Sequence, residues 1–106
     1  MLEYIKMKDL HDRMKNLGKN EIILDVRRPD EYAEGHIAGS INFSHDVIEN
    51  HISELKKYEK IYIHCRSGKR AQVALAALEK HGFKNIVCIA DGGMLDWVAA
   101  GYEVVK

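Results

Sequence analysis

The feature that most constrains the fold of this chain is the alternation of short apolar runs with segments of helical spacing. The apolar runs are rich in Ile and Val, as buried strands are, and they occur at EIILDV (21–26), SINF (40–43), KIYIHC (60–65) and NIVCIA (85–90). Strands that alternate with helices predict an α/β domain with a mainly parallel sheet and helices on both faces. In such sheets, ligands bind at the carboxyl edge of the strands.

The clearest helix is expected from Lys69 to His81, where Gly82 supplies a left-handed C-terminal residue and Phe83 follows it. We expect this helix to bury Val73, Ala74, Ala77 and Leu78. The other helical segments have their apolar positions at Leu10, Met14 and Leu17, closed by Gly18; at Val47, Ile48, Ile52 and Leu55, in one or two short helices; and at Leu95, Trp97 and Val98, ending at Gly101.

Composition limits the classes of function that the chain can have. At 106 residues, with 46% hydrophobic and 30% charged residues and no Gly/Ser linker or repeat, we expect a single domain over 1–106. The sixteen basic and sixteen acidic residues cancel, so no field draws the whole protein to nucleic acid or to a membrane. No signal peptide or membrane-spanning run is evident, and a cytoplasmic location follows as the default expectation.

The stretch IYIHCRSGKRA, residues 61–71, places a cysteine at the carboxyl end of an expected strand. Thiols react as thiolates, and a helix N-terminus with nearby cations favours the thiolate. If the loop curls around Cys65, its backbone amides form a nest of donors, and Gly68 supplies the necessary backbone freedom. The loop residues Arg66, Ser67, Gly68, Lys69 and Arg70 are therefore expected to hold a thiolate, a persulfide or a bound oxyanion.

Both cysteines have a simpler reading as small buried hydrophobic residues. For Cys65 an inert core role is less favoured, because the next five residues are small or polar and stand at the start of an expected helix. Cys88 lies between Val87 and Ile89 in an expected strand, so an inert buried thiol is favoured there over a sulfur relay. In a reducing compartment we expect both thiols to be free.

Three motifs in register resemble the rhodanese family of single-domain sulfurtransferases. They are LDVR with EYAEGHIAGSIN, the Cys65 loop, and GGMLDWVAAGY, and the resemblance covers nearly the whole chain. It implies a rhodanese-like fold with a five-stranded sheet flanked by helices. It also implies that Cys65 is the catalytic cysteine and opens a six-residue loop that ends at Arg70.

The reaction implied by the resemblance is a sulfur transfer of the thiosulfate:cyanide type through a Cys65 persulfide. No metal or organic cofactor is implied. A small anionic donor such as thiosulfate suits three loop cations better than mercaptopyruvate, whose users carry a less charged loop of the Cys-Gly-Ser-Gly-Val-Thr kind. The acceptor is cyanide or a thiol, and the persulfide of a partner protein is an alternative donor.

Two other function classes remain as alternatives. Tyrosine and dual-specificity phosphatases, and related arsenate reductases, carry a longer loop with arginine six positions after the cysteine. Here Ala71 takes that place and Arg70 comes one residue earlier, which favours sulfur transfer. A non-catalytic rhodanese-like binding module is the third reading, but such modules usually lack the cysteine.

Four residues near the strand ends are expected to support the loop: Asp25, Arg27, Glu31 and His36. We expect Glu31 or Asp25 to pair with Arg70 and fix the loop's shape, and an ordinary ion pair or strand-end cap is the alternative. His36 is expected to hold its turn by hydrogen bonding rather than to act as a base.

The remaining candidate residues are expected to have structural roles. His64 neighbours Cys65 but should point to the opposite side of its strand. Gly92 and Gly93 are expected to bring the start of the last helix to the active-site edge, with Trp97 as its packing anchor. The histidines and cysteines show no spacing of the zinc-ligand type, so no metal is expected.

Overall fold

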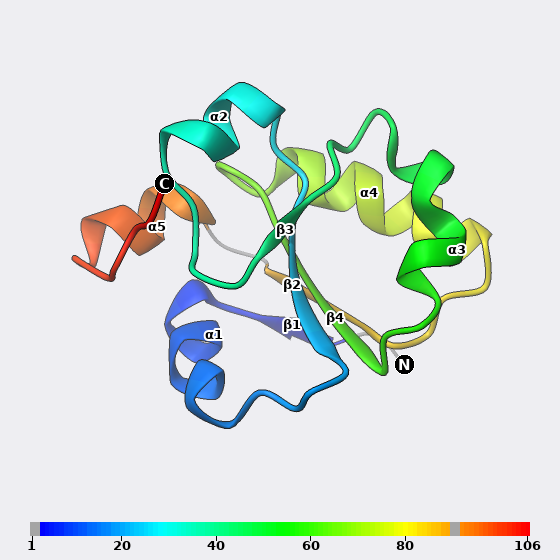
Figure 1. Cartoon of the computed structure of the whole chain (residues 1–106), viewed down its shortest axis with the longest axis horizontal. Helices are drawn as coiled ribbons and strands as arrows, with labels where there is room; N and C mark the ends of the chain where they lie inside the picture. Colours follow the sequence, from blue (N-terminus) through cyan, green and yellow to red (C-terminus); the bar gives the residue numbers. More distant parts are fainter. Residues whose placement is uncertain (1–2, 90–91) are drawn as a thin grey trace.

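A computed structural model describes residues 3–89 and 92–106 of the chain. It contains a five-stranded sheet in the order β1-β5-β4-β2-β3, in which every pairing is parallel (Figure 1). The strands are β1 (Glu3–Ile5), β2 (Glu21–Asp25), β3 (Ile41–Asn42), β4 (Lys60–His64) and β5 (Ile86–Ile89). The predicted parallel α/β architecture is confirmed, and each predicted strand is present in a shorter form; Ala90, at the end of the fourth predicted run, lies outside the described residues.

The register of the central strands places the ends of β2 and β4 at one level. Asp25 pairs with His64 across β2 and β4, and Ile63 pairs with Cys88 across β4 and β5. The residues that follow β2 and β4 therefore emerge together at the carboxyl edge of the sheet, as in other parallel sheets. Cys65 is the first residue beyond β4.

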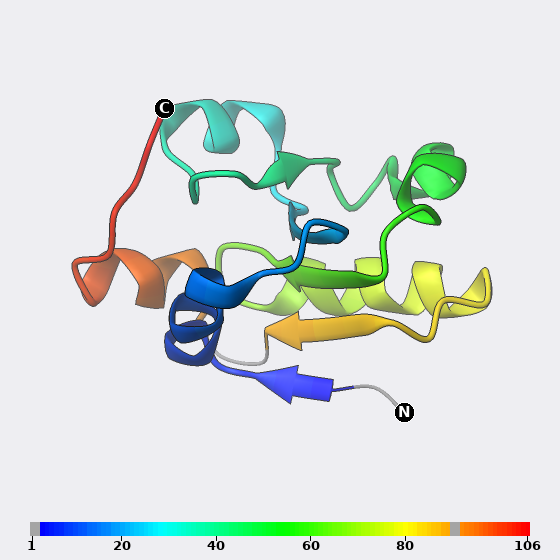
Figure 2. The same cartoon turned by 60° about the horizontal axis from the view of Figure 1, so that its bottom comes forward.

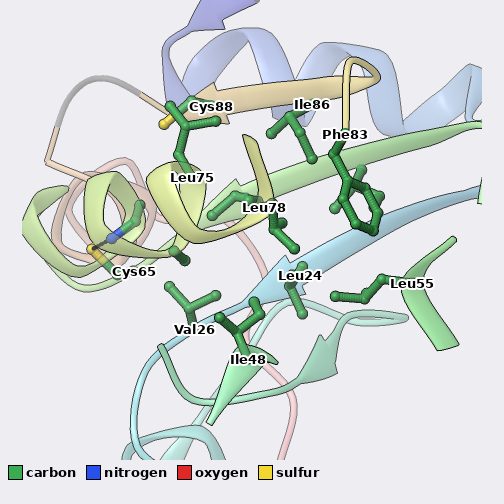
Figure 3. Packing of buried hydrophobic residues seen from close by; sticks show 14 residues of the cluster. Leu24, Val26, Ile48, Leu55, Cys65, Leu75, Leu78, Phe83, Ile86 and Cys88 are labelled. Carbon is green, nitrogen blue, oxygen red and sulfur yellow. Dashed lines mark hydrogen bonds between the residues drawn. The ribbon is translucent and has the colours of Figure 1, made fainter. Parts of the chain in front are cut away.

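Helices cover both faces of the sheet, as predicted. α3 (Ile52–Leu55) and α4 (Lys69–Lys80), with the 3-10 turn η2 (Ile48–His51), pack on one face, whose core includes Leu24, Ile63, Leu75 and Leu78 (Figures 1 and 3). α1 (Met7–Arg13) and α5 (Met94–Ala99) pack on the other face, whose core includes Leu10, Ile23, Tyr62 and Trp97. Successive residues of β4 alternate between these two cores because side chains alternate along a strand.

Gly82 and Phe83 end the helix α4 through a C-terminal capping motif. Gly82 has φ of 85° and donates its N–H to Glu79 O at 3.0 Å, and Phe83 N–H donates to Leu78 O at 3.1 Å. These two bonds and the packing of Phe83 in the same core as Leu78 form a Schellman motif, so the predicted stop is confirmed. The prediction that Val73 is buried was wrong: it is 55% exposed, because the apolar face of α4 follows Ala71, Ala74, Leu75 and Leu78 instead.

Three elements of the N-terminal half differ from the sequence-based expectation. β1 was not among the four predicted strands. The first helix is interrupted: α1 ends at Arg13, a 3-10 turn η1 (Met14–Asn16) follows, and Leu17 is extended. α2 (Pro29–Glu34) was not predicted, because its six residues have no buried face. Pro29 at the first helical turn and a hydrogen bond from Arg28 N–H to Glu31 Oε1 of 3.1 Å begin this helix.

The C-terminal residues return to α2. An antiparallel bridge joins His36 and Val105, with N–H to O distances of 2.9 Å in both directions. Both cartoon views place the C-terminus beside α2 (Figures 1 and 2). This return brings Val104 next to the carboxyl edge of the sheet, where it lines a groove described below.

Candidate active site

The Cys65 sulfur lies inside the curl of the loop that follows β4. Its Sγ accepts the backbone N–H of Gly68 at 3.0 Å and that of Ala71 at 3.3 Å. Gly68 has φ of 99°, a left-handed conformation that side-chain-bearing residues rarely adopt, and α4 begins at the next residue. The expected nest of donors is therefore present, and two amides at the start of a twelve-residue helix face the thiol.

Cys65 is at the same time part of the hydrophobic core. The residue is 1% exposed and packs in the cluster that includes Val26, Ala71 and Leu75 (Figure 3). The side chains of Arg66, Ser67 and Lys69 are exposed by contrast. The thiol thus lies under a polar, cationic loop and above an apolar floor.

The start of α5 is joined to the Cys65 loop by backbone hydrogen bonds. Met94 N–H donates to Cys65 O at 2.9 Å, and Leu95 N–H donates to Arg66 O at 3.2 Å. A Cβ on Gly93 would lie 2.2 Å from Cys65 O, and its φ of 57° also favours glycine. Gly92 N–H donates to Asp96 Oδ2 at 2.9 Å, and Gly92 O accepts the N–H of Leu95 at 3.1 Å. The expectation that Gly92 and Gly93 bring the start of the last helix to the edge with the Cys65 loop is confirmed.

Arg70 is fixed by Glu31, one of the two partners that we considered for it. The guanidinium donates from NH1 to Oε1 at 2.5 Å and from NH2 to Oε2 at 3.0 Å, and the two side chains are 24% and 15% exposed. Hydrogen bonding to Arg70, helped by the Arg28 N–H, lowers the pKa of Glu31 to about 2, although burial opposes this shift. The same pairing raises the pKa of Arg70.

Asp25 pairs with Arg27 instead of Arg70. Arg27 Nε lies 2.9 Å from Asp25 Oδ1 and its NH2 lies 2.7 Å from Oδ2, with both residues buried. The same NH2 donates to Gly35 O at 2.8 Å, so the pair connects β2 to the end of α2. A bidentate, buried pair of this kind orients the elements around the loop.

The two histidines near the edge are held structurally. His36 Nδ1 lies 2.8 Å from Tyr32 O, and its ring stacks on Tyr32 with centroids 3.7 Å apart. His64 is fully buried, and burial lowers its pKa. Its Nδ1 lies 3.4 Å from Cys65 O and its Nε2 lies 3.9 Å from Asp25 Oδ2, on the strand side opposite to the Cys65 side chain.

Cys88 and Trp97 lie away from the loop's polar surface. Both cysteines are free thiols, and burial, with a smaller contribution from Cys65, raises the pKa of Cys88 to about 11. Figure 3 shows Cys88 on β5 and Cys65 on the loop that follows β4, and both side chains belong to the core beneath α4. Trp97 is 2% exposed and donates its Nε1–H to Glu103 O at 2.8 Å, so it anchors α5 as expected.

Beside the loop, a groove of about 270 Å³ runs between α2 and α5. Arg66 contributes to it from the loop, and the other lining residues are Arg27, Glu31, Glu34, Gly35, Met94, Leu95, Val98 and Val104. Sequence reasoning did not identify this groove, because its walls come from three separate segments of the chain, residues 27–35, 66 and 94–104. The local sequence feature that belongs to the groove is the pair of exposed apolar residues Leu95 and Val98 on the last short helix.

Two negative observations apply to residues 3–89 and 92–106. No cluster of three or more His, Cys, Asp or Glu side chains there could hold a metal ion. None of the helices in these ranges combines the length and the apolar character needed to cross a membrane.

The model of the family described as Rhodanese-like domain matches residues 7–100. The chain belongs to the rhodanese-like domain family. Among curated proteins, this rhodanese-like domain is 34% identical over 91 residues to Thiosulfate sulfurtransferase GlpE of Pseudoalteromonas translucida, covering 85% of this chain and 86% of that protein. It is 39% identical over 75 residues to Putative sulfur carrier protein YrkF of Bacillus subtilis, covering 71% of this chain and 40% of that longer protein.

Solved structures give the same relationship. A rhodanese-related protein from Thermoplasma volcanium is 33% identical, has a TM-score of 0.83 and is matched over 97% of both chains. A Rhodopseudomonas palustris protein described as a possible tyrosine phosphatase has a TM-score of 0.87, with 98% of this chain and 85% of that chain covered. Its identity of 24% shows a shared fold and nothing about shared chemistry. The rhodanese-like domain thus has sulfurtransferases among its homologues.

Proposed function

We propose that this rhodanese-like domain is a sulfurtransferase of the thiosulfate:cyanide type that works through a persulfide on Cys65. The observation that carries the proposal is the pair of backbone N–H groups, of Gly68 and Ala71, that point at Sγ. Such donors stabilise a thiolate and the anion of a persulfide. Arg66 and Lys69, exposed on the same loop, favour the approach of a dianionic donor.

The proposed first step breaks a sulfur–sulfur bond in the donor. The Cys65 thiolate attacks the outer sulfur of thiosulfate, and sulfite leaves with the bonding electron pair. In the second step, cyanide or a thiolate attacks the outer sulfur of the persulfide, and Cys65 leaves as the thiolate. Thiocyanate or an acceptor persulfide is the product, and no net oxidation or reduction takes place.

The role of Arg70 in this proposal is to fix the loop. Both terminal guanidinium nitrogens of Arg70 donate to Glu31, and the residue after Arg70, Ala71, is buried. An arginine held in this way is not directed at a phosphoryl group in the nest. Four residues between Cys65 and Arg70 therefore favour sulfur transfer over the phosphatase and arsenate reductase chemistry of longer loops.

Mass spectrometry of the intact protein tests the proposal. After incubation with thiosulfate, we expect the mass to rise by one sulfur atom and to return to its starting value when cyanide is added. Cys65→Ser should show no rise, whereas Cys88→Ser, a matched change at the other thiol, should load sulfur as the parent does. A parent protein that loads no sulfur from thiosulfate or from a persulfide donor would refute the catalytic role.

The same variants separate the alternative functions. Turnover of an aryl phosphate that depends on Cys65 would indicate a phosphatase. A binding module would load no sulfur and would keep its interactions in Cys65→Ser. Circular dichroism of each variant must match the parent, because Cys65 is also a core residue.

A further inference from the structure

The groove between α2 and α5 gathers half of the large apolar side chains that the described residues expose. Over residues 3–89 and 92–106 these side chains are Tyr4, Val47, Val73, Leu95, Val98 and Val104. The last three line the groove, and they are 45%, 59% and 39% exposed. Single exposed apolar residues are ordinary on a protein surface, but several that converge on one concave site indicate an interaction surface.

The position of α5 leaves this apolar surface open to a partner. In both cartoon views, α5 lies at one end of the molecule, farther out than the sheet and the other helices (Figures 1 and 2). Met94 and Trp97 are buried against the domain, whereas Leu95 and Val98 are exposed. A partner can therefore reach the exposed side of α5 without displacing any described element.

The groove also carries two unpaired charges of opposite sign. Four charged side chains line it, and two of them, Arg27 and Glu31, already bind oppositely charged neighbours. Arg66 on the Cys65 loop and Glu34 on α2 are exposed, and neither forms an ion pair or a side-chain hydrogen bond among the described residues. The groove therefore has one free cation and one free anion beside its apolar wall.

A surface with one free charge of each sign is complementary to itself. When two copies face each other across a twofold axis, every contact occurs twice, so Arg66 of each copy meets Glu34 of the other. The charges that line the groove cancel, as do the sixteen basic and sixteen acidic residues of the whole chain. Long-range attraction therefore selects neither an acidic nor a basic partner, and two copies of the chain do not repel each other.

We propose that this groove is the interface of a twofold-symmetric homodimer. In the dimer, α5 of each copy lies against the groove of the other, with Leu95 and Val98 at the centre and the two Arg66–Glu34 pairs at the rim. Interfaces cover about a tenth of a small protein's surface, which for 5973 Å² is about 600 Å² per copy. An area of this size is typical of a weak, reversible dimer. The inference is independent of the proposed function, because it involves no reaction at Cys65.

Sedimentation velocity over a range of protein concentrations tests for the dimer. We expect the weight-average sedimentation coefficient to rise from the monomer value at about 1 µM toward the dimer value at about 1 mM. A chain that is still monomeric at about 1 mM overturns the proposal and leaves the groove to a different occupant.

The variant Val98→Lys tests the apolar centre of the interface. Val98 is 59% exposed, so the substitution leaves the core intact, and near the twofold axis it places two like charges close together. We expect the dimer Kd to rise at least about tenfold. Val73→Lys is the matched control, because Val73 is 55% exposed on α4 and does not line the groove. An equal rise in both variants would overturn the proposal.

Two charge reversals test the reciprocal pairing. In Glu34→Arg the introduced arginine faces Arg66 of the other copy, and in Arg66→Glu the introduced glutamate faces Glu34 of the other copy. Each substitution creates two like-charge contacts, so we expect each variant alone to dimerise about tenfold more weakly than the parent. In an equimolar mixture of the two variants, both contacts again join opposite charges, and a heterodimer with about the parent Kd should form.

The matched control for the mixture is the pair Glu79→Arg and Lys19→Glu, which makes the same charge changes at exposed positions outside the groove. Each of these variants, and their mixture, should associate as the parent does. The interface is refuted if the mixture of groove variants associates no better than each variant alone. It is also refuted if the control variants show the same loss and recovery.

Discussion

Glu31 holds the loop in place through a single side-chain pair. It lies on α2, 39 residues before Arg70 in the sequence, and it accepts hydrogen bonds from both terminal guanidinium nitrogens. It also accepts the N–H of Arg28 at the start of its own helix. One carboxylate thus joins the beginning of α2 to the end of the Cys65 loop, and its ionisation is linked to the stability of that junction.

Glu31→Gln should destabilise the protein in a pH-dependent way. The pKa of Glu31 falls from 4.5 to about 2 in the folded protein. Its contribution is therefore fully present above pH 4.5 and is lost as the pH falls toward 2. We expect the variant to lose about 1–2 kcal/mol of unfolding free energy at pH 6 in urea titrations, and the difference from the parent to shrink toward zero near pH 2.

Asp30→Asn provides the control for this measurement. Asp30 also pairs with an arginine, Arg28, but both side chains are nearly two-thirds exposed, at 64% and 65%. Exposed pairs contribute little, so we expect the unfolding midpoint in urea to stay at the parent value. A Glu31→Gln difference that is the same at pH 6 and near pH 2 would show that the carboxylate charge is not what fixes Arg70.

At the residue scale, sequence reasoning was most successful where the signal is local. Cys65, Gly68 and the cationic side chains follow a strand directly, so their meeting at the sheet edge follows from the parallel topology. The choice between Glu31 and Asp25 as the partner of Arg70 could not be made from sequence. In the structure, Arg27 donates to both carboxylate oxygens of Asp25, two residues away, and Arg70 pairs with Glu31 instead.

Among the elements, α5 is positioned by the absence of a side chain at Gly93. A Cβ on Gly93 would lie only 2.2 Å from the carbonyl oxygen of Cys65, which is too close for any side chain. Because Gly93 has no Cβ, the two backbones can approach each other and Met94 N–H can donate to that oxygen. The hydrogen bonds at the start of α5 therefore connect the helix to the loop, and through Leu95 to the groove wall. A side chain at position 93 must displace one of these elements.

Gly93→Ala should both destabilise the protein and slow sulfur loading. We expect a loss of about 2–4 kcal/mol in unfolding free energy, because the added Cβ collides with backbone and the φ of 57° becomes strained. The rate of persulfide formation, followed by mass spectrometry, should fall at least tenfold. Activity retained at the parent level would mean that the contact between α5 and the loop does not shape the site.

Gly101→Ala is the matched glycine control at the other end of α5. Gly101 also has a positive φ, of 77°, but a Cβ there would meet nothing within 4 Å. The cost should be limited to the left-handed conformation, about 1 kcal/mol, with no change in the loading rate. The comparison separates backbone strain in general from the specific collision with Cys65.

Element prediction succeeded where stop signals and long apolar faces coincide. The end of α4 could be predicted because Gly82 and Phe83 complete its capping motif. β1, with one buried residue in three, and α2, with none, lack the periodic apolar signal on which such predictions depend. Val73 was misplaced because an alanine-rich helix offers two adjacent apolar faces, and only packing against β4 and β5 selects between them.

In the molecule as a whole, β4 has the most protected position in the sheet. It is bonded to β2 on one side and to β5 on the other, whereas β1 and β3 form the edges. In hydrogen exchange we expect the amides of β4 to exchange slowest and those of β1 and β3 much faster, because edge amides open without breaking the central pairings. β1 amides as slow as those of β4 would show that the sheet unfolds only as one unit.

The overall architecture could be predicted from sequence because strand and helix periods alternate along the whole chain. Four apolar runs and the segments between them were sufficient for a parallel sheet with two covered faces. The groove could not be predicted, because Glu34, Arg66 and Val104 come from three distant segments. Only the bridge between His36 and Val105 brings the last of these to the site.

Cys65 connects the two halves of the molecule through different atoms. Its side chain packs in the core beneath α4, and its carbonyl holds α5, which belongs to the core on the opposite face. Under the proposed function, the same residue therefore serves both reactivity and folding. A substitution here that removed the proposed sulfur chemistry would still need a small side chain, because the core beneath α4 has room for no more.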